Sequence, residues 1–342
     1  MKYKKSNSHF EFVFNKTLLN SKRSHSKGQA ILNIVLFLLL VAVLFIAGYL
    51  LYLNLPGEPQ VLDVVIPSSV LEVSNLSSAV GQFYPNMKFN HDYISYNIAS
   101  DCSREKKYRM IEAFDELKNK VGIISFYSSI NNPDIEVSCS ESTKHSIEKD
   151  YFIAGEGGAK EIIQTGRYNV ITQGVILLYG EKKGIECDWP NVELHELLHV
   201  FGFDHSPDEN SLMFQYLESC SQKLDESIIN TLKELYSKEN LPDLYFNNVT
   251  GVKKGRYLDF NVTVKNSGTI DAENVFLAVF DGEDRLDNFD LKNIDFGAGI
   301  SFSAQNLKLN SRSSNNIKLV IDADNLVKEI DEENNLATLK FG

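Results

Sequence analysis

Positive charge is scarce in most of this sequence. Its 342 residues include 34 lysines and arginines against 46 aspartates and glutamates, a formal net charge of −12. Residues 1–29 contain seven basic residues and one acidic residue, so their net charge of +6 leaves −18 for the remainder. Because nucleic acids bind to basic surfaces, this balance argues against a nucleic acid as the partner of the main body.

Charged residues are absent altogether from residues 30–55, where Asn33 and Asn54 are the only strongly polar side chains. A helix rises about 1.5 Å per residue, so this stretch is long enough to cross the roughly 30 Å apolar core of a bilayer. Because the basic residues precede it, the positive-inside rule places residues 1–29 in the cytoplasm and the rest of the chain outside. We therefore expect a cell-membrane protein with one transmembrane helix at 30–55, followed by a proline- and serine-containing linker at 56–80.

Two other interpretations of the apolar segment stay open. It can be the core of a cleaved secretory signal, although no small-residue cleavage site stands beside Pro56. Alternatively, residues 26–30 (Ser-Lys-Gly-Gln-Ala) resemble the processing site of archaeal pilin-like precursors. Cleavage after Gly28 would remove the basic residues and keep the apolar helix.

Cysteine is also scarce, and no cysteine follows residue 220. The chain has only Cys102, Cys139, Cys187 and Cys220. On the outer side of a membrane, an even set indicates two disulfides in one of three connectivities. We expect Cys187–Cys220, which brackets the histidine-rich segment described next, and Cys102–Cys139 as the remainder. Free thiols, or a cysteine that binds a metal in a latent form, are the alternatives.

The segment that begins at His195 reads His-Glu-Leu-Leu-His-Val-Phe-Gly-Phe-Asp-His. On a helix, His195 and His199 stand one turn apart on the same face, so both imidazoles can bind one ion. Gly202 tolerates the left-handed conformation that ends a helix, and the turn brings in His205 as a third ligand. Three histidines leave one position of Zn²⁺ open for water, which is typical of a catalytic zinc. Glu196, one step around the helix, can reach that water as a general base.

This pattern, followed by Met213, resembles the metzincin metalloproteases, and residues 205–213 resemble the matrixins in particular. The resemblance implies zinc-dependent hydrolysis of peptide bonds. It also implies that Met213 forms a turn beneath the metal as a packing residue and not as a ligand. Phe214 and Gln215 stand where matrixins have a proline after this turn, which affects the pocket that Tyr216 would line.

Residues 81–240 have the element order of a metzincin catalytic domain, an α+β fold with a mixed twisted sheet and a zinc helix. Hydrophobic patterns predict strands at 88–98, 123–127, 134–137 and 170–179, and helices at 103–120, 192–201 and 228–236. By resemblance, the strand at 170–179, with Gly174, Val175 and Ile176, would be the sheet edge that pairs with an extended substrate. An ordinary internal strand is the alternative.

Residues 241–342 predict an all-β region, an antiparallel immunoglobulin-like sandwich. Strand-like runs recur at 257–264, 275–280, 300–302, 317–321 and 336–341, separated by turn residues. The segments 262–268 and 321–335 resemble CARDB, a cell-adhesion-related module, which implies a surface partner. Calcium is a further candidate ligand for an acidic cluster, with a solvated loop as the alternative. The cluster consists of Asp322, Asp324, Glu329 and Asp331.

Together these features predict a membrane-anchored, outward-facing zinc endopeptidase that acts on peptides or proteins, with a β-sandwich that positions it or binds a partner. The rival class is a surface binding or adhesion protein whose metal site is vestigial. The intact Glu196 argues against this rival, because a purely structural site does not need that carboxylate. A second rival is a peptidase that acts only at chain ends.

Overall fold

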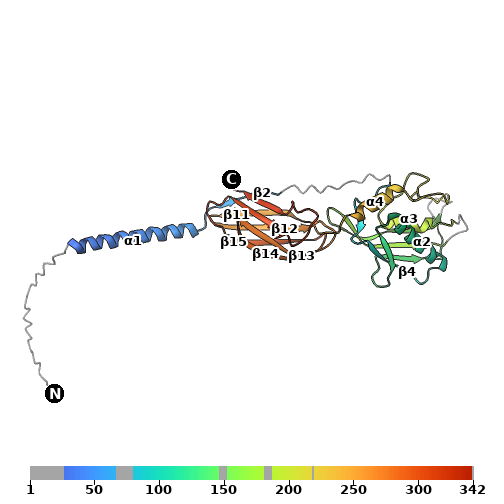
Figure 1. Ribbon diagram of the computed structural model, residues 1–342, viewed down its shortest axis with the longest axis horizontal. Helices are drawn as coiled ribbons and strands as arrows, with labels where there is room; N and C mark the ends of the chain where they lie inside the picture. The colour runs from blue at the N-terminus through green and yellow to red at the C-terminus, as the bar shows by residue number, and fades with distance from the viewer. Residues whose placement is uncertain (1–26, 67–79, 146–151, 181–186, 218, 341–342) are drawn as a thin grey trace, which may run out of the picture. The chain divides into compact units, whose positions relative to one another are not determined.

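The computed structural model describes residues 27–66, 80–145, 152–180, 187–217 and 219–340 (Figure 1). The chain divides into two units, residues 1–55 and 56–342. In the first unit, helix α1 (Lys27–Asn54) covers the predicted apolar segment 30–55 except its last residue. This helix is long and apolar enough to cross a membrane. A signal sequence near the N-terminus can have the same length and composition. The basic residues 1–26 lie outside the described residues.

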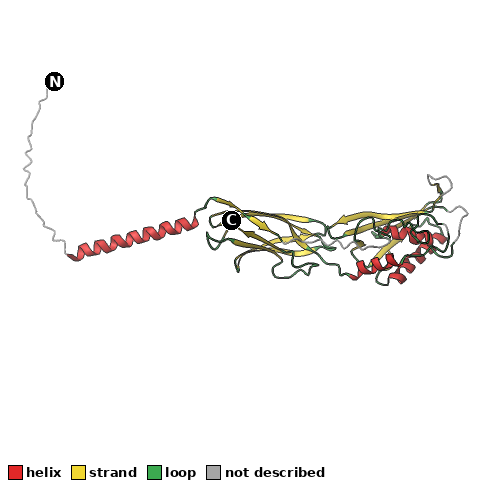
Figure 2. Ribbon diagram, turned by 90° about the horizontal axis from the view of Figure 1, so that it is seen from above, coloured by secondary structure: helices red, strands yellow, loops and turns green. Residues whose placement is uncertain are grey.

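Residues 80–237 of the second unit combine helices with a mixed sheet. The helices are α2 (Arg104–Val121), α3 (Asn191–Val200) and α4 (Glu226–Ser237). The strands are β3 (Met87–Phe89), β4 (Tyr93–Ile98), β5 (Ser125–Ser128), β6 (Ile135–Cys139), β7 (Lys144–His145), β8 (Phe152–Ile153), β9 (Gly155–Gln164) and β10 (Asn169–Leu178). Figure 2 shows the helices gathered on one side of the sheet.

The sheet places its parallel strands in the order β5-β4-β6-β10, with β3 also paired to β10. The last strand, β9, pairs with β10 in the antiparallel direction. Apolar side chains of the sheet and of α2, α3 and α4 form one core, which includes Phe114, Leu197 and Leu232. Helix α2 begins as predicted, because the Ser103 hydroxyl accepts a hydrogen bond from the Lys106 backbone N–H. The predicted α+β fold is confirmed.

Strand β10 is not the edge of this sheet. Gly174, Val175 and Ile176 each pair with β6 on one side and with β9 on the other. The prediction that they form the substrate-binding edge is therefore wrong, and the antiparallel strand β9 occupies the edge. The pattern of apolar residues at 170–179 identified a strand but carried no information about its neighbours. The sequence Gly-Glu-Gly-Gly-Ala at the start of β9 has low strand propensity, which concealed the true edge.

The C-terminal region is a two-sheet sandwich of β-strands, which confirms the predicted all-β fold. Its strands are β11 (Leu244–Lys254), β12 (Tyr257–Asn266), β13 (Ala272–Asp281), β14 (Asp284–Ile294), β15 (Gly299–Lys308), β16 (Asn316–Ile321) and β17 (Leu336–Lys340). One sheet has the order β1-β11-β12-β15, where β1 is Pro59–Val61. The other has the order β14-β13-β16-β17-β2, where β2 is Asp63–Val65. The two sheets enclose a core of buried residues that includes Phe260, Leu277 and Leu339.

Both sheets are extended by residues that were predicted to be a linker. Strand β1 (Pro59–Val61) pairs with β11, and strand β2 (Asp63–Val65) pairs with β17. Leu62, between the two strands, is 7% exposed and belongs to the sandwich core. The linker interpretation of residues 56–80 is therefore wrong for 59–65, and residues 67–79 lie outside the described part. Two strands of three residues each are too short to give a readable alternation in the sequence.

Candidate metal centre

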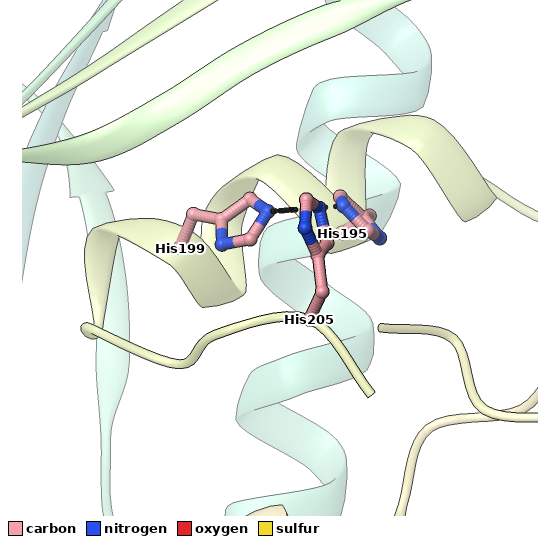
Figure 3. Close-up of side chains that lie close together, drawn as sticks. All are labelled: His195, His199 and His205. Carbon is pink, nitrogen blue, oxygen red and sulfur yellow. Dashed lines mark hydrogen bonds between the residues drawn. The ribbon is translucent and has the colours of Figure 1, made fainter. Parts of the chain in front are cut away.

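Three imidazoles converge beside helix α3. His195 and His199 project from successive turns of the helix, and His205 rises from the loop that follows it (Figure 3). The Nε2 atom of His199 lies 3.0 Å from Nε2 of His195 and 3.2 Å from Nε2 of His205. One ligand atom from each of the three residues lies within 4.8 Å of the other two. The helix and its terminal turn thus bring together the residues that the sequence motif predicted.

Two of the rings are oriented by main-chain carbonyls. His195 Nδ1 donates to the carbonyl of Leu212 at 2.7 Å, and His199 Nδ1 donates to the carbonyl of Phe203 at 2.7 Å. A proton on Nδ1 leaves the Nε2 lone pair free to bind a metal. Burial and the neighbouring His199 lower the pKa of His195 to about 3, and burial also lowers the pKa of His199. Both rings are therefore held in the neutral form that metal ligands require.

The donor set fits zinc. Tetrahedral zinc binds imidazole nitrogens at about 2.0–2.1 Å, which places neighbouring ligand atoms roughly 3.3 Å apart. The two Nε2 separations of 3.0 and 3.2 Å are close to that value. Nitrogen donors without cysteine or carboxylate partners favour a borderline metal such as zinc over calcium or magnesium.

The turn after α3 depends on Gly202. Its φ of +85° lies in the left-handed region, and a Cβ there would stand 2.3 Å from the Met87 sulfur. A larger residue would therefore be strained, and the Met87 side chain would have to shift to make room for it. The Gly202 N–H donates to the His199 carbonyl at 2.9 Å, and the chain then leads directly to His205. The predicted role of this glycine in ending the helix agrees with its geometry.

Met213 has no exposed surface and belongs to the same core as the apolar side chains of α3. Its carbonyl accepts a hydrogen bond from the Ser206 N–H at 2.7 Å, and its own N–H donates to Ser211 Oγ at 3.0 Å. The Ser211 hydroxyl in turn donates to Asp225, the residue that precedes α4, at 2.6 Å. The sequence motif predicted Met213, but it gave no signal for the bracing pair Ser211 and Asp225.

The Glu196 side chain lies between α3 and β9. It is 7% exposed, and burial raises its pKa to about 8, opposed by a hydrogen bond from the Gly157 backbone N–H. A nearby metal cation would lower the pKa again. A Cβ on Gly155 would meet the Glu196 side chain at 2.6 Å, and a Cβ on Gly157 would meet the Glu196 carbonyl oxygen at 2.1 Å. Strand β9 approaches the helix this closely because both residues lack side chains.

An aromatic contact, two side-chain hydrogen bonds and a disulfide hold the loop between Met213 and α4 in place. Its aromatic residues Phe214 and Tyr216 pack edge to face, with ring centroids 5.8 Å apart. The buried Gln222 side chain donates to the carbonyls of Tyr216 at 2.9 Å and Glu209 at 3.2 Å. A disulfide joins Cys220 in this loop to the segment before α3. Sequence reasoning missed Gln222, because one glutamine in a polar loop carries no distinguishing pattern.

Two disulfides are present, Cys102–Cys139 and Cys187–Cys220, with Cα–Cα distances of 5.1 and 5.3 Å. The predicted pairing is confirmed. Neither the free-thiol alternative nor a cysteine ligand to the metal agrees with this structure.

The acidic residues considered for calcium do not form a comparable site. Asp324 pairs with Arg285, and Asp331 lies 3.8 Å from Arg167. Within the described ranges, the three histidines are the only group of three or more His, Cys, Asp or Glu side chains spaced closely enough to hold one ion.

Comparison with known proteins confirms both resemblances. Residues 88–237 match the family model of the matrixins, and residues 241–339 match the CARDB model. The first match indicates a zinc-dependent metalloprotease, and the second indicates a cell-surface domain. No curated protein matches the chain.

Solved structures similar to part of the chain include two CARDB-type domains. One is the CARDB domain of a Pyrococcus furiosus protein, crystallised in complex with di-metal ions. It is 20% identical, covers 30% of this chain and 88% of its own, and has a TM-score of 0.25. Another is a domain of a putative cell surface protein from Methanosarcina acetivorans, 16% identical over 30% of this chain and 91% of its own, also with a TM-score of 0.25.

Proposed function

We propose that this protein is a membrane-anchored zinc endopeptidase in which His195, His199 and His205 bind the metal and Glu196 is the general base. The convergence of three Nε2 atoms at α3, the helix that also carries the buried Glu196, supports this proposal. The matrixin match over the same residues supports it independently. A vestigial site would not need to keep Glu196 oriented between α3 and a hydrogen-bond donor on β9.

The metal, the base and the edge strand would each have a separate role in catalysis. When bound, zinc supplies Lewis-acid polarisation of the scissile carbonyl and lowers the pKa of a water molecule towards 7 or so. Glu196 accepts the proton of the attacking water and returns it to the leaving amine, and the Gly157 N–H holds the carboxylate in place for both transfers. Strand β9, at the edge of the sheet, is the element that we expect to bind an extended substrate by main-chain pairing.

Replacement of the base tests the assignment. We expect Glu196→Ala to lower kcat by about 10²-fold or more while the zinc content stays near one per chain, because Glu196 is not a ligand. The control is Glu209→Ala, which removes an exposed carboxylate from the nearby loop and should leave both quantities unchanged. Peptide cleavage by Glu196→Ala at the wild-type rate would refute the proposed base.

A digest of an unfolded protein distinguishes the type of peptidase. Mass spectrometry should show internal fragments from the earliest time points, and a chelator should abolish them. Products that shorten one residue at a time from a chain end would favour an exopeptidase instead. Chelator-resistant cleavage would contradict a metal-dependent mechanism.

The membrane arrangement is part of the proposal. The length and apolar composition of α1 support a single-pass anchor, and the basic residues before it support a cytoplasmic N-terminus. The CARDB match supports a surface role for residues 241–342, including contact with a surface partner. Protease added to intact cells should therefore digest the β-sandwich and spare an epitope placed before residue 27; digestion of that epitope would reverse the orientation.

A further inference from the structure

Phe83 is an exposed aromatic residue at the candidate metal centre. Its ring packs against the ring of His199, with centroids 6.1 Å apart and an angle of 26° between the two planes. Although it has this contact, Phe83 is 53% exposed. Single exposed aromatic side chains are common on protein surfaces, so the exposure alone assigns no role to this residue. The place of the ring beside a metal-ligating histidine is what calls for an explanation.

The backbone around Phe83 is fixed to the turn that follows α3. The Phe83 N–H donates to the Gly202 carbonyl at 2.7 Å. The side chain of the preceding residue, Gln82, donates to the Phe201 carbonyl at 2.9 Å. Both acceptors belong to the short segment that leads from α3 to His205. The segment that carries Phe83 is therefore bound to the same turn that positions the third histidine, and its ring has a defined place.

The ring of Phe83 lies within reach of a peptide bound at the three histidines. His205 is exposed, so the cluster is open to solvent on that side. His199 Nδ1 is bonded to a main-chain carbonyl, which leaves Nε2 as the ligand atom. Because a bond from imidazole nitrogen to zinc is about 2 Å long, a metal held there is within roughly 10 Å of the Phe83 ring centroid. Neighbouring Cα atoms of a peptide are ~3.8 Å apart, so a side chain next to the scissile bond can contact this ring.

From these observations we infer that Phe83 is a specificity-determining residue, whose exposed ring contacts one of the two substrate side chains that flank the scissile bond and favours an apolar one. An apolar side chain in this place removes its own surface and that of the ring from water. A polar or charged side chain would lose hydration there and gain no hydrogen-bond partner from a phenyl ring. This inference rests on the proposed peptidase function.

Quenched fluorescent peptides test the inference with the full-length chain in detergent. They start from a site found in the digest described above, and each residue that flanks the scissile bond is changed in turn to leucine, serine or glutamate. At one of these two positions, wild-type kcat/KM should be about tenfold higher for leucine than for serine. Phe83→Ala should reduce this ratio to about twofold and leave the serine peptide and the zinc content unchanged. The control, Tyr84→Ala, removes the adjacent aromatic residue, which is 47% exposed, and should keep the wild-type ratio.

A charge at residue 83 separates contact with the substrate from support of His199. In Phe83→Lys the glutamate peptide should overtake the leucine peptide at the same position, because an ammonium group attracts a carboxylate. Tyr84→Lys, which adds the same charge one residue away, should cause no such reversal. Binding gives a readout without cleavage: in the Glu196→Ala background, fluorescence anisotropy of labelled leucine and glutamate peptides should show the same reversal in Kd.

Three results would overturn the inference. One is an unchanged ratio of leucine to serine in Phe83→Ala, and another is the absence of any gain for glutamate in Phe83→Lys. The third is loss of zinc from these variants, which would mean that the ring serves only to support His199. All three leave cleavage by the wild type intact and so spare the peptidase function, whereas a wild type that cleaves no peptide would refute that function first.

Discussion

Gly157 and Gly158 are adjacent residues of β9 with opposite surroundings. A methyl group on Gly157 would stand 2.1 Å from the Glu196 carbonyl oxygen, whereas one on Gly158 would meet nothing within 4 Å. We expect Gly157→Ala to push β9 away from α3 and to lower kcat at least tenfold, with zinc still bound because no histidine is touched. Gly158→Ala, the matched control, should keep wild-type kinetics. Equal activity of the two variants, measured beside their zinc content, would contradict the role given to the close approach.

The ionisation of Glu329 should make the stability of the sandwich depend on pH. Burial raises its pKa to about 8, although the Leu244 N–H and the Asn335 side chain both donate to it. Between pH 4.5 and about 8 the unfolded chain releases this proton while the folded chain retains it. The free energy of unfolding therefore falls as pH rises through this window, by at most about 1.4 kcal/mol per pH unit. Urea unfolding at several pH values should show a shallower fall for Glu329→Gln than for wild type; parallel curves would exclude the effect.

At the level of elements, the loop before α4 depends on Gln222. Its buried side chain satisfies two carbonyls, so Gln222→Ala should lower the free energy of unfolding by about 1–3 kcal/mol. The altered position of Phe214 and Tyr216 should also change the cleavage pattern on a peptide library, while zinc binding persists. Gln215→Ala is the control, because Gln215 is exposed in the same loop. An unchanged cleavage pattern in Gln222→Ala would separate this loop from substrate recognition.

The sequence predicted an element where its pattern of residues agrees with the contacts that the element makes in the fold. In helix α3 the two agree, because the spacing that places His195 and His199 on one face also buries Leu194 and Leu198 behind them. Strand β9 lacks a clear pattern, since its glycines weaken its strand propensity, and its position depends on the close approach of α3. The identity of an edge strand depends on pairing between distant segments, which no local pattern records. The three clustered histidines were therefore predictable, whereas the edge strand β9 beside α3 was not.

For the molecule as a whole, the least expected feature is that the chain adds strands to the sandwich before it forms the peptidase region. Substitution of Leu62 tests this feature, because the Leu62 side chain is 7% exposed between the sheets while its neighbour Val61 is 80% exposed. We expect Leu62→Ala to lower the free energy of unfolding of the sandwich by about 2–5 kcal/mol and Val61→Ala to change it by less than about 0.5 kcal/mol. Similar small effects of both substitutions in denaturant unfolding would show that residues 59–65 are only a tether.

A second substitution shows whether Leu62 occupies the place seen in the structure. A Cβ on Gly251 of β11 would lie 2.4 Å from Leu62 Cδ1, so Gly251→Ala alone should be destabilising through overpacking. In the Leu62→Ala background the same methyl group would enter the space that the leucine leaves. The double variant should therefore be more stable than the sum of the single effects predicts. Strict additivity would mean that the two residues do not touch, and the first strands after α1 would then not belong to the sandwich core.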